Sequence, residues 1–252
     1  MAIQRMITFS NLGQYGRLGN QMFQIASVIG IAGKNGHDYI FPEWKYTPYM
    51  RKALPTGIVP ATKIDEVGFH YNEFKVGEGA YDIVGYLQSW KYFDHVKDTV
   101  NEYFTLSDGH KNAVDSIARS FGDNTCSIHV RRTDYVNLAQ HHPVMPVAYY
   151  TRAMEIMGDC TYVVFSDDIA WCRENFVGGK FVFVHESHPD IYDMMLMAKC
   201  KHNIIANSSF SWWGAYLNGN PDKKVIAPAK WFGPAYDKLN THDLLPENWS
   251  KI

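Results

Sequence analysis

A regular alternation of apolar segments and helical periodicity in the second half of the 252-residue chain constrains the fold more than any other feature. The expected strands are residues 126–130, 161–165, 181–184, 202–206 and 224–227. Strands that are apolar throughout are buried on both faces, which is typical of parallel sheets covered by helices. The pattern therefore predicts an α/β fold whose ligands bind where the strands end.

The first half of the chain shows the same strand and helix patterns, interrupted by a long segment without periodicity. Strands are expected at residues 6–9, 37–41 and 81–87, and a helix with Met22, Ile25, Ala26 and Ile29 on one face is expected to stop at Gly36. Residues 42–79 show no sustained period and are expected to be irregular, whereas 94–121 are expected to be helical with a break at 106–109. We place a lobe boundary near residue 122, which gives lobes 1–122 and 123–252.

The composition excludes several classes of protein. With 46% hydrophobic residues the chain can bury a core, and its formal charge of −2 implies no broad surface for nucleic acid or anionic membranes. The longest apolar run is far below the roughly 20 residues of a membrane span, and no signal-peptide pattern is present. The four cysteines lack zinc-like spacing, so we expect reduced thiols in the core. We expect a cytoplasmic protein, with peripheral membrane attachment left open.

The segment Cys126–Tyr135, CSIHVRRTDY, ends an expected strand with His129, Arg131, Arg132 and Asp134. Adjacent arginines repel each other and are costly to desolvate, which suggests an anion in front of them. Alternation along the strand would send the two arginines to opposite sides, one toward a ligand and the other toward a carboxylate. A surface Arg–Asp pair of little energetic value is the alternative interpretation.

Polar residues also end two other expected strands. Ser208 and Ser209 fit either a helix cap or, with the helix dipole, an anion cradle, and both interpretations stay open. The neighbouring Trp212 and Trp213 are expected to be core residues. Asp167 and Asp168 suggest a cap, and no metal is expected because the chain contains no Asp-x-Asp.

Three further positions have an ordinary and a functional interpretation. Asp193 in the first turn of a helix is favoured by the helix dipole, but its carboxylate could also accept two hydrogen bonds from guanine. The stretch 16–21 contains a lone Gly-x-x-Gly, which is a weak motif, and fits a tight turn; the pair His141 and His142 fits an exposed loop, a metal ligand or a base. With no cysteine or third histidine at ligand spacing, zinc is not expected.

Several segments together resemble the bacterial-type α-1,2-fucosyltransferases. They follow the order and approximate spacing of that family from about residue 7 to 249: GRLGNQMFQIA, GYLQSWKYF, HVRRTDY, SDDIAWCRENF, DMMLMAKCKHNIIANSSFSWWGAYLN, VIAPAKWF and LLPENW. The resemblance implies a two-lobed glycosyltransferase of the B-type fold with a small N-terminal lobe. It also implies GDP-β-L-fucose as donor, a glycan as acceptor, inversion at the anomeric carbon and no metal or other cofactor.

The resemblance assigns roles to individual residues. Arg131 is expected to bind the β-phosphate, with Arg132 supporting the site or the contact between the lobes. Asp134 is added to the expected catalytic residues because of its proximity in sequence. The expected donor-binding residues are His129, Arg131, Asp167, Asp193, Asn207, Ser208, Ser209, Phe210 and Ser211. The residues expected on the acceptor side or between the lobes are Arg17, Asn20, Gln21 and His142.

Two departures from the family leave linkage and acceptor open. Thr133 stands where the family usually has Gly, which gives the RRTD form of α-1,6-fucosyltransferases, and the N-terminal lobe is short. The general base is not identified: Asp134 and His142 are near in sequence, and a residue such as Ala139 stands in place of the glutamate of the α-1,6 enzymes. The alternatives are another linkage, another GDP-sugar or a non-catalytic role in binding a GDP-sugar or glycan.

Overall fold

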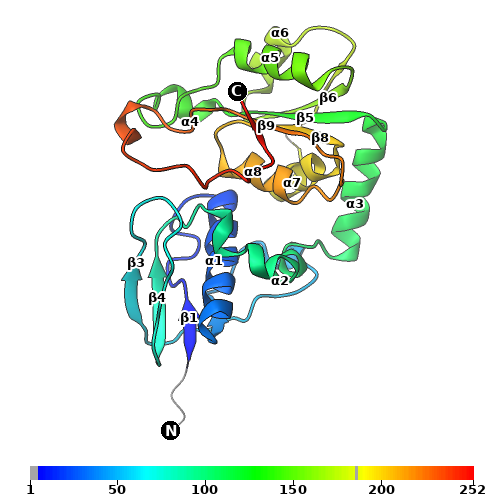
Figure 1. The fold of residues 1–252 in the computed structure, drawn as a ribbon. Helices are drawn as coiled ribbons and strands as arrows, with labels where there is room; N and C mark the ends of the chain where they lie inside the picture. Colours follow the sequence, from blue (N-terminus) through cyan, green and yellow to red (C-terminus); the bar gives the residue numbers. More distant parts are fainter. Residues whose placement is uncertain (1–4, 185–186) are drawn as a thin grey trace. The chain divides into compact units, whose positions relative to one another are not determined.

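The computed structural model describes residues 5–184 and 187–252. The chain folds as two compact units (Figure 1). The first unit consists of the residues up to Lys111 together with Leu239–Glu247, and the second of Asn112–Lys238 together with Asn248–Ile252. The sequence predicts one boundary, near residue 122. In the structure the first unit ends at Lys111 and also includes a short segment from near the C-terminus.

The first unit contains a four-stranded parallel sheet in the order β2-β1-β4-β3. Its strands are β1 (Met6–Thr8), β2 (Asp38–Ile40), β3 (Thr62–Asp65) and β4 (Ala80–Val84). The unit also contains α1 (Leu18–Asn35), α2 (Lys97–Tyr103) and short 3₁₀ turns at Thr47–Tyr49, Trp90–Tyr92 and Asp94–Val96. Strand β3 corrects the expectation of irregular structure: it is an edge strand with mostly exposed polar residues, so it has no apolar pattern.

Helix α1 is the buried centre of the first unit. It ends as expected at Gly36, whose φ of 64° is left-handed and whose N–H donates to the Ala32 carbonyl. Gly30 faces the 90–93 segment so closely that a Cβ built there would overlap the Tyr92 carbonyl oxygen. The absence of a side chain at Gly30 therefore lets the helix and this segment pack directly against each other.

The second unit contains a six-stranded parallel sheet in the order β10-β9-β8-β5-β6-β7. Its strands are β5 (Thr125–Val130), β6 (Thr161–Ser166), β7 (Phe181–Phe183), β8 (His202–Ile204), β9 (Val225–Ala227) and β10 (Ser250–Lys251). The helices are α3 (Asp108–Ala118), which starts in the first unit, α4 (Thr133–Val136), α5 (Val147–Met157), α6 (Ile169–Asn175), α7 (Asp190–Lys199) and α8 (Ser209–Tyr216), with 3₁₀ turns at Arg119–Phe121 and Pro234–Tyr236. Figure 1 shows α5 and α6 on one side of this sheet and α7 and α8 on the other, which confirms the predicted α/β arrangement.

The strand order places a topological switch beside β5. From β5 the chain proceeds to β6 and β7 on one side and then returns to β8 on the other side. In open parallel sheets ligands bind at the carboxyl ends of the strands where the order reverses. Arg131 directly follows β5 and Asn207 follows β8, so both lie at this edge.

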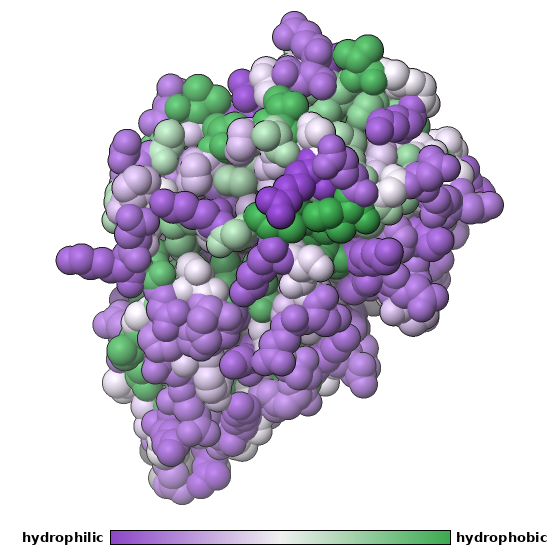
Figure 2. All heavy atoms as spheres, turned by 45° about the horizontal axis from the view of Figure 1, so that its top comes forward, coloured by the Kyte–Doolittle hydropathy of each residue, from purple (hydrophilic) through white to green (hydrophobic). Residues whose placement is uncertain are grey.

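The core agrees with several expectations from the sequence. Trp212 and Trp213 are fully buried, and all four cysteines are buried free thiols. On the face shown in Figure 2, polar side chains predominate and apolar ones gather in separate areas. Among the described residues, no helix is both long and apolar enough to cross a membrane.

Two glycines of α1 provide a matched test of the close packing between this helix and residues 90–93. Gly30→Ala should lower the free energy of unfolding by about 1–3 kcal/mol, since the added methyl group collides with the Tyr92 backbone. Gly33→Ala should leave stability unchanged or raise it by up to about 1 kcal/mol, because the nearest atom to its Cβ would be in the Val96 side chain, at 3.4 Å. Urea unfolding of both variants measures the difference, and equal stability would contradict the close approach.

Candidate functional site

The Arg131 guanidinium lies between two carboxylates at the end of β5. Its Nη2 is 2.7 Å from Oδ1 of Asp134, and its Nη1 is 3.1 Å from Oδ2 of Asp167. The side chain is only 15% exposed, so these charge-assisted contacts are weakly screened by solvent. Two carboxylates on different elements therefore fix the direction of this guanidinium.

Arg132 is held separately by the residues that follow the next strand. Its Nε donates to Oδ2 of Asp168 at 3.0 Å, and its guanidinium lies over the Trp171 ring at 4.1 Å. Asp168 also caps α6, as the sequence predicts, by accepting from the Trp171 N–H. The two arginines thus use different carboxylates, and both are paired, whereas strand alternation predicted that only one would be held in this way.

Asp167 organises the turn between β5 and α4. Its Oδ1 accepts from the Arg132 backbone N–H at 2.9 Å, and its Oδ2 accepts from the Thr133 hydroxyl at 2.6 Å while facing Arg131. The chain turns into α4 immediately after Arg132, so strand alternation does not continue through the arginine pair. The hydroxyl of Thr133 is therefore part of the support of Arg131.

Aspartates compensate the charge of the adjacent arginines. Two guanidinium groups face three carboxylates, those of Asp134, Asp167 and Asp168. Asp134 is the most exposed of the three, with 36% of its side chain accessible. It is thus the carboxylate that an incoming anion could displace from Arg131 at the lowest cost.

His129 lies in the interior of the second unit. Its ring packs against Phe210 with 5.5 Å between the ring centres, and Nδ1 is buried with no hydrogen-bond partner among the described residues. Burial, reinforced by the charge of Arg131, lowers the pKa of His129 to about 3. The imidazole is therefore neutral and has a nitrogen available for a ligand.

The turn after β8 shows both helix-cap and structural roles for its polar residues. The Ser208 hydroxyl accepts from the Phe210 N–H and caps α8, and Ser209 is half-buried. Ser211 is buried and donates to the Ala206 and Ser208 carbonyls, so its hydroxyl is used within the fold. Asn207 donates to the Pro143 and Trp231 carbonyls, while its Oδ1 has no partner among the described residues.

His142 and Asp193 occupy different parts of the second unit. His142 stacks on Tyr135 at 4.9 Å and contacts Phe232 and Tyr236. Burial, together with neighbouring positive charge, lowers its pKa. Asp193 lies in the first turn of α7, after the edge strand β7, with Oδ1 3.8 Å from Nδ1 of His188.

The remaining predicted residues lie in the first unit, at the start of α1. Gln21 is buried, donates to the Gly16 carbonyl and accepts from the Trp44 indole, so its amide is structural. Asn20 accepts from the Gln88 side chain at 2.8 Å, and Arg17 is exposed at the N-cap position.

Two contributors to the site were not predicted from the sequence. Trp171 stacks on Arg132, and Thr133 donates to Asp167. Trp171 stands three residues after Asp168, so a parallel β5–β6 pairing would have indicated its proximity to the arginines. Thr133 was recognisable only as a departure from the family pattern, which carries no information about its contact.

Among residues 5–184 and 187–252, no group of three or more His, Cys, Asp or Glu side chains is placed to hold a metal ion. Asp167 and Asp168 are both engaged with the arginine pair. Their carboxylates are therefore used in ion pairs within the protein.

Comparison with known proteins gives consistent results. The chain is 34% identical to the Escherichia coli O-antigen biosynthesis glycosyltransferase WbnK over 62% of this chain and 56% of that protein. It is 34% identical to an Escherichia coli α-1,2-colitosyltransferase over 69% of this chain and 63% of the relative. It is 30% identical to the galactoside α-(1,2)-fucosyltransferase 2 of Gorilla gorilla gorilla over 81% of this chain and 67% of the relative. The chain thus spans less than two thirds of the two bacterial relatives.

Solved structures show the same fold at low sequence identity. The fucosyltransferase NodZ from Bradyrhizobium superposes with a TM-score of 0.55 at 13% identity, covering 84% of this chain and 92% of NodZ. A glycosyl transferase family 9 protein from Veillonella parvula gives a TM-score of 0.58 at 12% identity, covering 100% of this chain and 87% of that one. These likenesses confirm the expected B-type glycosyltransferase fold class.

The sequence profile of one family covers nearly the whole chain, from residue 3 to residue 252, and thus includes every residue of the arginine site. Together with the relatives at 30–34% identity, this match shows that the chain belongs to glycosyl transferase family 11.

Proposed function

We propose that the protein transfers L-fucose from GDP-β-L-fucose to a galactose hydroxyl of a glycan, forming an α-1,2 linkage with inversion and without a metal. The observation that carries this proposal is the Arg131 guanidinium, held by Asp134 and Asp167 at the carboxyl edge of β5. Family membership and the names of the relatives support the reaction class and the linkage.

The second unit supplies groups suited to a guanosine diphosphate. The N-terminus of α8 presents backbone N–H groups, which favour phosphate oxygens, at the switch point beside Arg131. The neutral His129 offers a ring nitrogen, unpartnered among the described residues, to a hydrogen-bonding ligand. A structure of the α-1,6-fucosyltransferase NodZ, which has the same fold, was obtained after soaking with GDP-fucose.

Arg131 would act as GDP departs. Cleavage of the bond between fucose C1 and the β-phosphate oxygen leaves additional negative charge on the phosphate, and a fixed guanidinium stabilises this charge more than it stabilises the ground state. Asp167 and Thr133 keep Arg131 in place, while the more exposed Asp134 gives way to the phosphate. The acceptor oxygen forms its bond to C1 on the opposite face and loses its proton to a base.

The contacts favour His142 over Asp134 as that base. The Asp134 carboxylate is engaged by Arg131 at 2.7 Å and is the group that the donor phosphate replaces there. His142 has a lowered pKa and is therefore neutral near pH 7, with Nδ1 unpartnered among the described residues. A neutral imidazole can take a proton from a hydroxyl, an effect worth roughly 10²- to 10⁴-fold in rate.

Another linkage is the main alternative because Thr133 gives the RRTD form. This threonine acts on the donor side, where its hydroxyl supports Asp167 and thereby Arg131. The contact bears on the donor site and carries no information about the acceptor hydroxyl, so the linkage has to be measured.

The first test is a transfer assay with GDP-fucose and a panel of β-galactosides in excess EDTA. We expect an α-1,2-fucosylated product at the rate seen without EDTA, because arginine and helix N–H groups and not a metal neutralise the diphosphate. Linkage analysis by NMR identifies the product. A product of another linkage would overturn the α-1,2 assignment, and complete dependence on added Mn²⁺ would overturn the metal-independent mechanism. Tight binding of GDP-fucose with neither transfer nor hydrolysis would favour the binding-protein alternative.

Arg131→Ala should lower kcat/KM for transfer by at least about 10²- to 10³-fold, as expected for the loss of a transition-state charge partner. Arg131→Lys should recover only part of this loss, because an ammonium cannot contact two carboxylates through a planar fork. The matched control is Arg152→Ala, which changes an exposed arginine on α5. Steady-state kinetics at equal folded fraction decide the question, and a loss below about threefold for Arg131→Ala would contradict the proposal.

His129 should make stability depend on pH. Because its pKa of about 3 in the folded protein is below the value near 6.5 of an unfolded chain, the unfolded state binds one more proton between these limits. The contribution of neutral His129 to the free energy of unfolding is complete above pH 6.5. It decreases by about 1.4 kcal/mol per pH unit as the pH falls toward 3. Urea unfolding gives the free energy of unfolding at each pH between 7 and 5. The slope of this free energy against pH should be smaller by about one proton in His129→Gln than in the parent protein. Identical slopes would contradict the burial of a neutral imidazole.

A further inference from the structure

A second group of polar side chains lies in the first unit, at the carboxyl ends of β3 and β4. Glu66 directly follows β3, and its Oε2 accepts from the Tyr86 and Leu87 backbone N–H groups that follow β4. Leu87 has a φ of 54°, an unusual conformation for a residue with a side chain. Gly85 permits the contact, because a Cβ at this position would lie 2.5 Å from the Glu66 carboxylate.

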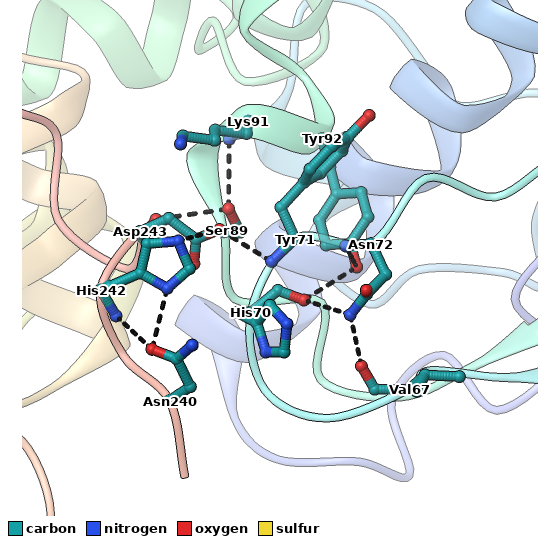
Figure 3. A network of polar contacts seen from close by, with 10 residues as sticks. All are labelled: Val67, His70, Tyr71, Asn72, Ser89, Lys91, Tyr92, Asn240, His242 and Asp243. Atoms are coloured by element: carbon teal, nitrogen blue, oxygen red, sulfur yellow. Dashed lines mark hydrogen bonds and ion pairs between the residues drawn. The ribbon is translucent and has the colours of Figure 1, made fainter.

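The segment 239–247 adds a second carboxylate to this group. Asp243 accepts from the Tyr71 backbone N–H through Oδ2 at 2.8 Å, and its carbonyl accepts from the Ser89 hydroxyl (Figure 3). Its side chain is only 1% exposed. Burial, together with the charge of Asp243, raises the pKa of Glu66, so the two carboxyl groups interact electrostatically.

Each carboxylate leaves one oxygen unused. Oε1 of Glu66 and Oδ1 of Asp243 are both buried with no hydrogen-bond partner among the described residues. The same is true of Nδ1 of His70, whose ring lies 5.7 Å from that of His242 (Figure 3). A buried acceptor without a donor is unfavourable, so several such atoms in one cluster indicate a ligand that brings hydrogen-bond donors.

The surroundings favour a neutral sugar over a cation. Each carboxylate already has one oxygen bound to backbone N–H groups, which leaves single acceptors suited to hydroxyl groups and not a bidentate metal site. Tyr71, whose backbone N–H binds Asp243, has a half-buried ring that packs against the buried ring of Tyr92 with ring centres 5.0 Å apart, and aromatic side chains are frequent in the lining of small-molecule sites. His242 is more than half exposed beside Asp243, and its ring is held on the other side by the Asn240 side chain, 2.8 Å from Nδ1.

The cluster also adjoins residues expected on the acceptor side. Leu87 is held by Glu66, and the next residue, Gln88, donates to Asn20 at the start of α1. Since all four strands of this sheet are parallel, the ends of β1, β3 and β4 share one edge. Glu66 and Asn20 are therefore connected along the edge of the sheet where ligands bind in such folds.

We infer that Glu66 and Asp243 form an acceptor-sugar subsite in which each buried carboxylate oxygen accepts a hydrogen bond from a hydroxyl of the glycan. This inference rests on the proposed function for the identity of the ligand, a galactoside. It assigns the C-terminal segment 239–247 a role in binding the acceptor through Asp243.

The test measures sugar binding separately from transfer. Methyl β-galactoside is titrated into the GDP-saturated full chain and followed by ligand-observed NMR, and acceptor KM is measured in parallel. Asp243→Asn and Glu66→Gln preserve shape and should each weaken binding and raise the acceptor KM at least about tenfold, with GDP-fucose KM and slow GDP-fucose hydrolysis unchanged. The matched control is Asp65→Asn, an exposed carboxylate at the end of β3 that should behave like the parent protein.

Monodeoxy galactosides identify the hydrogen bond directly. One deoxy sugar should bind the parent protein more weakly, because it lacks the hydroxyl that bonds a carboxylate. In the variant that lacks this carboxylate, the same deoxy sugar should bind no more weakly than methyl β-galactoside, because the two changes remove the same interaction. If Asp243→Asn does not fold, Glu66→Gln supports the same comparison. Galactoside binding within about twofold of the parent in the folded variants would overturn the subsite even if transfer is observed. Carboxylate-dependent sugar binding without transfer would uphold the subsite and overturn the transferase proposal.

Discussion

The ion pairs of Arg131 are the interaction on which the arginine site of the second unit depends. An arginine at the end of a buried strand is costly to desolvate unless its charge is compensated, and Asp134 and Asp167 provide this compensation. Asp167 also binds the Arg132 backbone and the Thr133 hydroxyl, so one carboxylate determines both the turn and the direction of the guanidinium. The same contacts that stabilise the buried charge also fix the direction of the guanidinium.

The fold explains why these partners meet. Strands β5 and β6 are parallel neighbours, with Val130 opposite Ser166, so the residues that follow each strand emerge side by side. Arg131 and Arg132 leave one strand where Asp167 and Asp168 leave the other. The reversal of strand order beside β5 then opens the edge next to α8, whose N-terminus presents backbone N–H groups.

The sequence predicted those parts of the fold whose cause is local. Strands buried on both faces and helices with one apolar stripe were recognised, and so was the stop at Gly36. Strand β3 was missed because its residues at the sheet edge are exposed and polar, and β10 because it has only two residues. The partners of the arginines depend on which strands are neighbours, and the burial of the Ser211 hydroxyl depends on helix packing. Neither can be read from residue spacing.

The two polar clusters differ in a way that matches the chemistry of their proposed ligands. In the second unit the charged groups are already paired, so a diphosphate must exchange with Asp134 and can bind because it carries charge of its own. In the first unit Glu66 and Asp243 retain oxygens without donors among the described residues, and the neutral hydroxyls of a sugar can satisfy these oxygens without displacing any ion. Desolvation explains the contrast: a buried arginine needs its counter-ions before the ligand arrives, whereas a carboxylate stabilised by backbone N–H groups can keep one acceptor unused until the sugar binds.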